Sequence, residues 1–312
     1  MDGRRKELRG GFGVRRGGDH FYGPQGETLY ERWWRPRPTA GVYGSPPVTP
    51  RASVVILHGL KEHSGRYDLV GDRLARDGYA ARAFDLLGHG NSEGRRCYVS
   101  RFDRYTEELA SFLERVRRGE PEAPVFVLAH SMGGTVAVLL ALYQGLDVRG
   151  LILSSPVLQP GEDVSPLLVR LSKVVGAVLP WVPAVRVDEA ALSRDPAVAR
   201  EVRRDPLVPS GNAPARTGAE LLRAIELIDT RIEYLSLPLL VLHGTADRLA
   251  DPDGSRYLAE NVSSGDVTLK LYEGFYHETL NDPERDRVVD DILRWLDARA
   301  EAPAPETAEE EG

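Results

Sequence analysis

One serine lies in a sequence context that is typical of a nucleophile. The segment PVFVLAHSMGG carries Ser131 between an apolar run, residues 124–130, and a helical pattern that starts at Met132. A strand that turns directly into a helix through a serine is the context of a nucleophile elbow. The residues two before and two after the serine must be small, and Ala129 and Gly133 are. We therefore predict that Ser131 is a nucleophile; the alternative is a serine that only caps the helix.

A nucleophilic serine needs a base within hydrogen-bond reach and a carboxylate that orients the base. With an elbow of this kind, the acid follows the serine in the chain and the histidine follows the acid. Only His277, of seven histidines, follows the last predicted strand, so it is the predicted base. Asp247, three residues past Gly244, follows the preceding strand and is the predicted acid. Asp251 and Asp253 are alternatives, but DPDG is more typical of a turn that opens a helix.

Two backbone amides are candidates for holding a developing oxyanion. The N–H of Met132 lies at the start of the helix, where the helix dipole favours negative charge. A second donor is expected from the loop after an early strand, and Leu60, which follows SVVILHG, is the candidate. Asp85 also ends a predicted strand, but it precedes the serine, and we expect it to hold its own turn.

The loop after Leu60, KEHSGRY, is dense in polar side chains. Glu62 and Arg66 could pair and hold the loop in shape, or they could line a polar end of a substrate pocket. His130, next to the serine, is a further candidate for substrate contact. These three residues are therefore predicted only as possible substrate-binding positions.

Several histidines that precede Ser131 in the chain raise the question of whether the protein binds a metal ion. His58 could be a ligand together with His63 or His89. The spacing is poor, and the pattern H-E-x-x-H does not occur. A single cysteine, Cys97, excludes a zinc site built on several cysteines and a disulfide framework. We therefore predict no metal and no cofactor.

The elements that must position these residues alternate along the chain. Apolar runs at residues 53–59, 79–85, 124–130, 151–156, 238–244 and 267–274 are predicted strands, and residues 67–77, 103–118, 132–144, 253–260 and 283–299 are predicted helices. Several runs are continuous leucine and β-branched sequences, as strands buried on both faces of a parallel sheet require. An α/β fold with a mostly parallel central sheet flanked by helices follows.

Residues 157–236 interrupt the alternation, because they hold no convincing strand. They contain an apolar stretch at 167–179, many prolines at 180–214, and a helical pattern at 218–234. Inserted between two strands, they are expected to form a helical cap over the carboxyl ends of the strands, where ligands bind in open α/β sheets. The core is then expected to cover residues 22–156 and 237–300.

Both ends of the chain are predicted to be loose. The basic arm at 1–21 and the acidic tail at 301–312 cannot bury enough apolar area to offset their ordering entropy. The net charge of −7 gives no indication of nucleic-acid binding. The first residues contain no apolar run and do not read as a secretory signal, so we expect a cytoplasmic protein.

Taken together, the motifs resemble a known enzyme family. HGLKEHSGRY, DLLGHGNSEG, AHSMGG, LSRDP…RRDPL, HGTADRLADPDGS and LKLYEGFYHE match, in wording and order, serine hydrolases of the α/β-hydrolase fold, and more narrowly the monoacylglycerol lipase and lysophospholipase branch. The similarity covers roughly residues 22–298. It implies a helical cap inserted after the sixth strand, with an apolar channel for an acyl chain.

The resemblance also implies a reaction and a substrate. By position, Ser131 is the nucleophile, Asp247 the acid and His277 the base, with Leu60 and Met132 as oxyanion donors. The implied reaction is ester hydrolysis through an acyl-enzyme, with a monoacylglycerol as substrate. A lysophospholipase, a general carboxylesterase and a ligand-binding protein on a hydrolase scaffold are the alternatives.

The cap carries two further implications of the resemblance. The outer helices of such caps rest on membranes, which implies peripheral membrane contact, with Arg170 and Lys173 near lipid head groups. The alternative is that the apolar stripe at 167–179 packs onto the core. Val202 stands where monoacylglycerol lipases tend to place a polar contact for the glycerol head.

Overall fold

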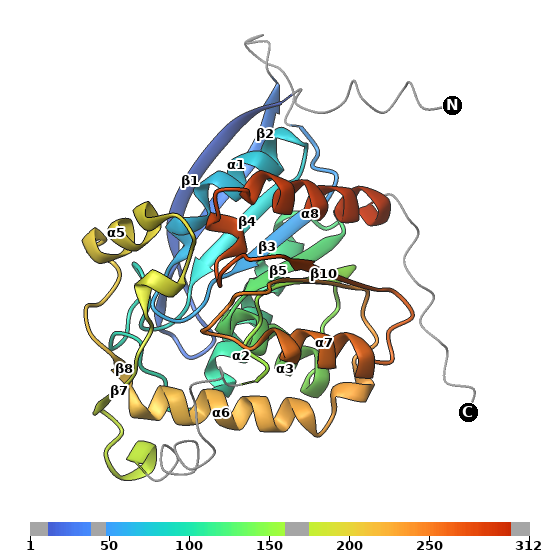
Figure 1. Ribbon diagram of the computed structural model, residues 1–312. Coiled ribbons are helices and arrows are strands. Elements are labelled where there is room, and N and C mark those ends of the chain that lie inside the picture. The colour runs from blue at the N-terminus through green and yellow to red at the C-terminus, as the bar shows by residue number, and fades with distance from the viewer. Residues whose placement is uncertain (1–11, 39–47, 160–174, 301–312) are drawn as a thin grey trace, which may run out of the picture.

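A computed structural model describes residues 12–38, 48–159 and 175–300 of the chain. An eight-stranded sheet with the order β1-β2-β4-β3-β5-β6-β9-β10 forms its centre (Figure 1). The strands are β1 (Phe12–Tyr22), β2 (Thr28–Pro38), β3 (Ser53–Leu57), β4 (Ala80–Asp85), β5 (Val125–His130), β6 (Gly150–Ser154), β9 (Leu239–Gly244) and β10 (Val267–Tyr272). The six strands from β4 to β10 in the sheet are parallel, whereas β1 and β2 are antiparallel additions at one edge.

Helices cover both faces of the sheet. They are α1 (Asp68–Arg76), α2 (Asp103–Gly119), α3 (Met132–Tyr143), α7 (Pro252–Asn261) and α8 (Arg285–Ala300). Side chains alternate between the faces: Val55 and Leu57 of β3 pack with α2, α3 and α7, and Val54 and Ile56 pack with α1 and α8. Figure 1 shows α1 and α8 together on one side of the sheet and α2, α3 and α7 on the other. The predicted strands and these helices are confirmed, with ends that differ by about two residues or fewer.

The prediction of a loose arm at residues 1–21 was wrong for its last part. Residues 12–21 belong to β1, which pairs with β2 along its whole length, from Phe12 opposite Pro38 to Tyr22 opposite Thr28. Most β1 side chains are exposed or half-buried, so backbone hydrogen bonds rather than apolar burial hold this strand. The core therefore begins at residue 12 instead of 22. Residues 1–11 and the predicted tail at 301–312 lie outside the described residues.

The insertion between β6 and β9 contains η2 (Glu189–Ala191), α5 (Pro196–Arg204), α6 (Ala215–Asp229) and η3 (Ile232–Tyr234). The expectation of no strand there needs a small correction, because β7 (Pro183–Val185) and β8 (Ala213–Pro214) form a short antiparallel pair. Strands of two or three residues that contain proline are too short to show the hydrophobic pattern from which strands are predicted. Arg170 and Lys173 lie in 160–174, outside the described residues.

The edge strand β2 is attached to α1 by one tryptophan. Trp34 is fully buried, and its indole N–H donates to Asp68 Oδ1 at 3.1 Å. A Cβ at Gly71 of α1 would lie 2.2 Å from Cδ2 of the indole ring. Glycine is therefore required inside this helix by the close approach of a ring.

Gly71→Ala should lower the free energy of unfolding by about 1–3 kcal/mol, because the added methyl group overpacks the contact with Trp34. Helix propensity alone predicts the opposite, a gain of about 1 kcal/mol. Urea unfolding measures the difference. Gly265→Ala is the control, since a Cβ there meets nothing within 4 Å; equal stability of the two variants would contradict the packing argument.

Candidate active site

Ser131 occupies a strained turn between β5 and α3. Its φ of 54° and ψ of −122° lie outside the region that residues with a side chain prefer. The turn is held from two sides, because the Ser131 amide donates to the Ser154 carbonyl at 3.0 Å and Gly134 N–H donates to the Ser131 carbonyl at 2.9 Å. The strain is thus fixed by β6 and by the first turn of α3.

Small residues around the turn allow α3 to approach the end of β3. A Cβ at Gly133 would lie 2.6 Å from the carbonyl oxygens of both Leu57 and His58. A Cβ at Gly59 would lie 2.9 Å from the Cβ of Ser131. Ala129, on the strand side of the elbow, is fully buried in β5. The loop after β3 and the first turn of α3 therefore meet at the serine.

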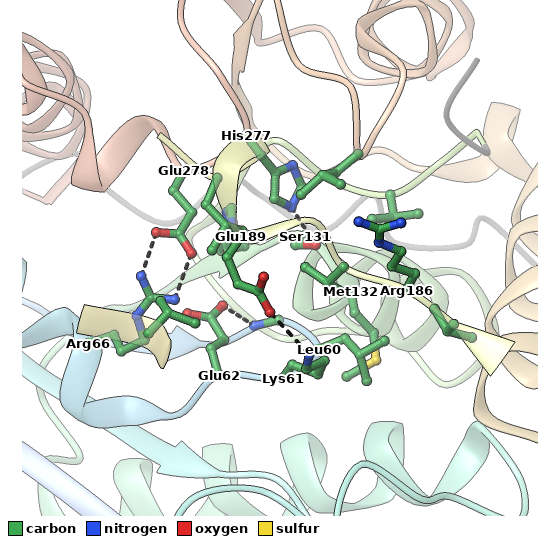
Figure 2. Close-up of a pocket in the computed structure, with 18 of the residues that line it drawn as sticks. Leu60, Lys61, Glu62, Arg66, Ser131, Met132, Arg186, Glu189, His277 and Glu278 are labelled. Atoms are coloured by element: carbon green, nitrogen blue, oxygen red, sulfur yellow. Dashed lines mark hydrogen bonds and ion pairs between the residues drawn. The ribbon is translucent and has the colours of Figure 1, made fainter. Parts of the chain in front are cut away.

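The three predicted reactive residues form one chain of hydrogen bonds. Nε2 of His277 is 2.9 Å from Oγ of Ser131, and its Nδ1 is 2.7 Å from Oδ2 of Asp247. All three residues are buried, and each follows the carboxyl end of a different parallel strand: β5, β9 or β10. Figure 2 shows the imidazole of His277 directly beside Ser131. The alternatives belong elsewhere: Asp251 accepts from the Asp253 amide and caps α7.

Four donors surround the carboxylate of Asp247. Oδ1 accepts from the amides of Leu249 at 2.8 Å and Ala250 at 3.1 Å, and Oδ2 faces His277 and His243. Burial alone would raise the pKa of Asp247, but the two histidines outweigh it and hold that pKa well below its usual range. Asp247 is therefore a carboxylate at neutral pH. Burial lowers the pKa of His277, and the charge and hydrogen bond of Asp247 outweigh it, so the pKa lies above 6.5.

Sequence reasoning missed His243. It lies in β9, and its Nε2 is 3.0 Å from Oδ2 of Asp247. The signal was present in PLLVLHG, where a histidine ends an otherwise apolar strand four residues before the predicted acid. A buried polar residue at such a position needs a hydrogen-bond partner, and the nearby carboxylate is one.

A cavity of about 120 Å³ opens above Ser131 between the core and the cap. Its apolar lining comes from Leu60, Met132, Val157, Val185, Val187, Leu192, Val202, Leu221 and Leu249, and its polar lining from Lys61, Glu62, Arg66, His130, Arg186, Glu189, His277 and Glu278. In Figure 2, Glu62, Arg66 and Glu278 lie together on one side of Ser131, and Arg186 lies on the other. The cavity is therefore polar on the side that carries Arg66.

Glu62 and Arg66 line this cavity, but each has a partner other than the one considered from the sequence. Arg66 forms a bidentate ion pair with Glu278, with N–O distances of 2.7 and 2.6 Å. Oε1 of Glu62 accepts from the Gly59 amide and from the Tyr67 hydroxyl, the latter at 3.0 Å. The two residues thus hold different loops in shape while facing the same cavity.

The remaining predicted residues also lie at the cavity. His130 donates from Nδ1 to the Ser154 carbonyl at 2.9 Å, and its ring centroid is 4.8 Å from that of His277. Burial lowers the pKa of His130 to about 4, so the ring is neutral at pH 7. Leu60, in the loop after β3, and Met132, at the start of α3, both line the cavity. Among the described residues, neither of their amides donates to a protein acceptor.

The histidines considered as metal ligands are engaged otherwise. Both ring nitrogens of His58 are used, Nδ1 with the Gly59 carbonyl and Nε2 with the Leu86 amide. Asp85 accepts from the amides of Ser64 and Asn91, which gives it the expected role in its turn. Across 12–38, 48–159 and 175–300, no three His, Cys, Asp or Glu side chains are grouped to hold a metal ion.

The cap touches the loops that carry the site. Nε2 of His63 is 2.9 Å from Oδ2 of Asp205, which follows α5. Lys61 Nζ lies 3.7 Å from Oε1 of Glu189 in η2. The Glu278 amide, next to His277, donates to the Leu192 carbonyl at 2.7 Å. Loop and cap are therefore joined within one residue of His277.

Known proteins are similar to this chain in sequence and fold over most of its length. The family model described as "Serine aminopeptidase, S33" matches residues 48–284. The chain is 38% identical to a monoacylglycerol lipase of Mycolicibacterium smegmatis over 81% of this chain and 90% of the relative. It is 34% identical to a monoglyceride lipase of Homo sapiens over 90% of each chain. The crystal structure of the Paleococcus ferrophilus monoacylglycerol lipase, 30% identical, covers 92% of this chain and 99% of its own with a TM-score of 0.74.

Because the family match spans most of the chain and the relatives agree with it in fold, the protein belongs to the hydrolase family described as "Serine aminopeptidase, S33", in the monoacylglycerol lipase branch of the α/β-hydrolase fold.

Proposed function

We propose that the protein hydrolyses carboxylic esters through an acyl-enzyme, and that its substrate is a monoacylglycerol. The observation that carries the proposal is the hydrogen-bonded chain from Ser131 through His277 to Asp247 at the floor of a cavity. The choice of substrate is supported by the similarity to relatives that are named monoacylglycerol lipases. The products are a fatty acid and glycerol.

The proposed reaction uses each group in turn. His277 Nε2 accepts the proton of Ser131 as Oγ attacks the ester carbonyl, and Asp247 stabilises the imidazolium that forms. The amides of Leu60 and Met132 donate to the oxyanion, with the amino-terminal end of α3 adding its dipole. The alcohol leaves with the proton of His277. Water then attacks the acyl-enzyme by the same route and releases the acid.

The lining of the cavity supports an amphipathic substrate. Its valine and leucine side chains suit an acyl chain, and Glu62 and Arg66 suit the hydroxyl groups of an alcohol. Oε1 of Glu62 is engaged by the loop, so we assign hydroxyl recognition to its Oε2. A cavity of about 120 Å³ is smaller than the about 300–1,000 Å³ of typical ligand sites. Under this proposal, a long acyl chain would extend beyond this cavity.

The surface of the cap supports peripheral contact of this enzyme with a membrane. Val178, Leu179, Trp181 and Val182 are large apolar residues with 71%, 54%, 50% and 41% of their surface exposed. None of the helices in the described residues is long and apolar enough to cross a bilayer. Exposed apolar side chains on the cap would bring the enzyme to a substrate that resides in lipid.

The substrate assignment is tested with a monoacylglycerol, a lysophosphatidylcholine and a short-chain nitrophenyl ester, each with wild type and Ser131→Ala. Wild type should act fastest on the monoacylglycerol, and the variant should lose about 10⁴–10⁶ in kcat because the nucleophile is gone. A fluorophosphonate probe should label wild type only. If wild type hydrolyses only the short ester, the proposal is reduced to a carboxylesterase. If it prefers the lysophosphatidylcholine, the enzyme is a lysophospholipase. Equal rates for wild type and Ser131→Ala would refute the role of Ser131 as the nucleophile.

The rate should depend on pH through His277. Its protonated ring cannot accept the serine proton, so kcat/KM should rise as pH rises through the pKa of His277 and then level off. Because Asp247 raises that pKa above its ordinary 6.5, the midpoint should lie above pH 6.5. Asp247→Asn should lower kcat by about 10⁴-fold. A wild-type midpoint clearly below 6.5 would contradict the assigned pairing.

Membrane contact is tested by vesicle flotation with phosphatidylcholine and phosphatidylglycerol. Val178→Glu together with Leu179→Glu should abolish flotation, because two charges would enter the apolar cluster. Hydrolysis of a water-soluble ester should stay near the wild-type rate. The matched control is Tyr22→Glu on β1, which is 80% exposed and far from the cap in the sequence. Flotation that is equal in the double variant and the control would refute the contact.

A further inference from the structure

The carboxylate of Asp247 binds two histidines, and only one of them reaches the serine. Oδ2 of Asp247 is 2.7 Å from Nδ1 of His277 and 3.0 Å from Nε2 of His243. The side chains of His243 and Asp247 are both 0% exposed. A buried imidazole that shares the oxygen used by the base is placed to influence the base through that oxygen.

The surroundings of His243 determine which nitrogen carries the hydrogen. Nε2 faces Oδ2 of Asp247 and, at 3.3 Å, the Ala250 carbonyl, and both are acceptors only. The hydrogen therefore lies on Nε2. Nδ1 is 2.6 Å from Oγ of Ser255, a buried residue of α7. A serine of α7 thus orients the donor that points at Asp247.

We infer that His243 is a positioning residue for the proposed hydrolysis. It fixes the carboxylate of Asp247 and sets how strongly that carboxylate attracts the proton of His277. With Leu249 and Ala250 on Oδ1 and two imidazoles on Oδ2, the carboxylate has about as many donors as it can accept. Each donor withdraws charge from the oxygens. His243 therefore limits the attraction of Asp247 for the proton and keeps His277 able to act as a base near neutral pH.

Other charged and titratable groups also face His277 and must stay constant in a test. Glu278 comes from its own loop, Glu62 from the loop after β3, and His130 from the end of β5. Arg66 neutralises Glu278 through their ion pair. His243 hydrogen-bonds with Ser255, Asp247 and the Ala250 carbonyl and with none of these groups, so replacing it leaves their contacts with His277 in place.

The test is His243→Leu, with His243→Gln as the rescue variant. Loss of the N–H donor should strengthen the pull of Asp247, so the acidic limb of kcat/KM for a nitrophenyl ester should move to higher pH by about 0.5–1 unit. Glutamine retains an N–H near the position of Nε2 and should move the limb back. A lost packing contact alone would lower the rate at every pH without moving the limb. A limb that stays, or moves to lower pH, would overturn the inference.

Two further measurements keep the test decisive. His20→Leu removes an exposed imidazole of β1 and should leave the profile unchanged. If His243→Leu does not fold, Ser255→Ala should give a smaller shift in the same direction, and no shift would again overturn the inference.

The inference rests on the proposed function, but the two can fail separately. NMR titration of His277 in protein with isotope-labelled histidine reads the same shift without turnover. If the proposed function is wrong, the wild-type protein will neither hydrolyse esters nor react with the fluorophosphonate. Failure of the inference would appear as unchanged titration of His277 in the His243 variants.

Discussion

The contact between the first turn of α3 and the end of β3 is the constraint on which the site depends. Gly133 allows this contact, because any side chain there would clash with the carbonyl oxygens of Leu57 and His58. With that approach fixed, Ser131 has to accept a left-handed φ to connect β5 to α3. The same approach brings together Leu60 and Met132, whose amides are the proposed oxyanion donors. One steric relation between backbones thus positions the proposed nucleophile and both proposed donors.

The proposed base, His277, is held by a different kind of interaction. The loop after β10 carries His277, and Glu278 connects this loop to Arg66 by a buried ion pair and to the Leu192 carbonyl by its amide. Burying two charges costs desolvation energy, so such a pair contributes geometry more than stability. Its consequence is that the loop of His277 is tied both to the loop after β3 and to the cap. A displacement of the cap would therefore be felt one residue from the base.

The parallel core and the grouping of Ser131, Asp247 and His277 could be predicted from the sequence because both leave local patterns. Continuous apolar runs require burial on two faces, and PVFVLAHSMGG combines such a run with small residues around a serine. The edge strand β1 leaves no such pattern, since its side chains are largely exposed and its ladder with β2 uses backbone groups. The sequence could not identify the partner of Arg66 either, because Glu278 lies 212 residues away in the chain and Glu62 is much closer.

Under the proposed function, chemistry and specificity are carried by different parts of this fold. Ser131, His277 and Asp247 follow strands of the core, where parallel neighbours fix the carboxyl ends. The cap supplies much of the apolar lining, including Val202 at the position where relatives were expected to place a polar contact. Under the proposed function, recognition of the alcohol then passes to core residues on the polar side of the cavity. The cap is anchored on the core through α6, whose Ala224 and Ile228 pack among core side chains, and its described residues contribute no strand to the sheet that positions Ser131.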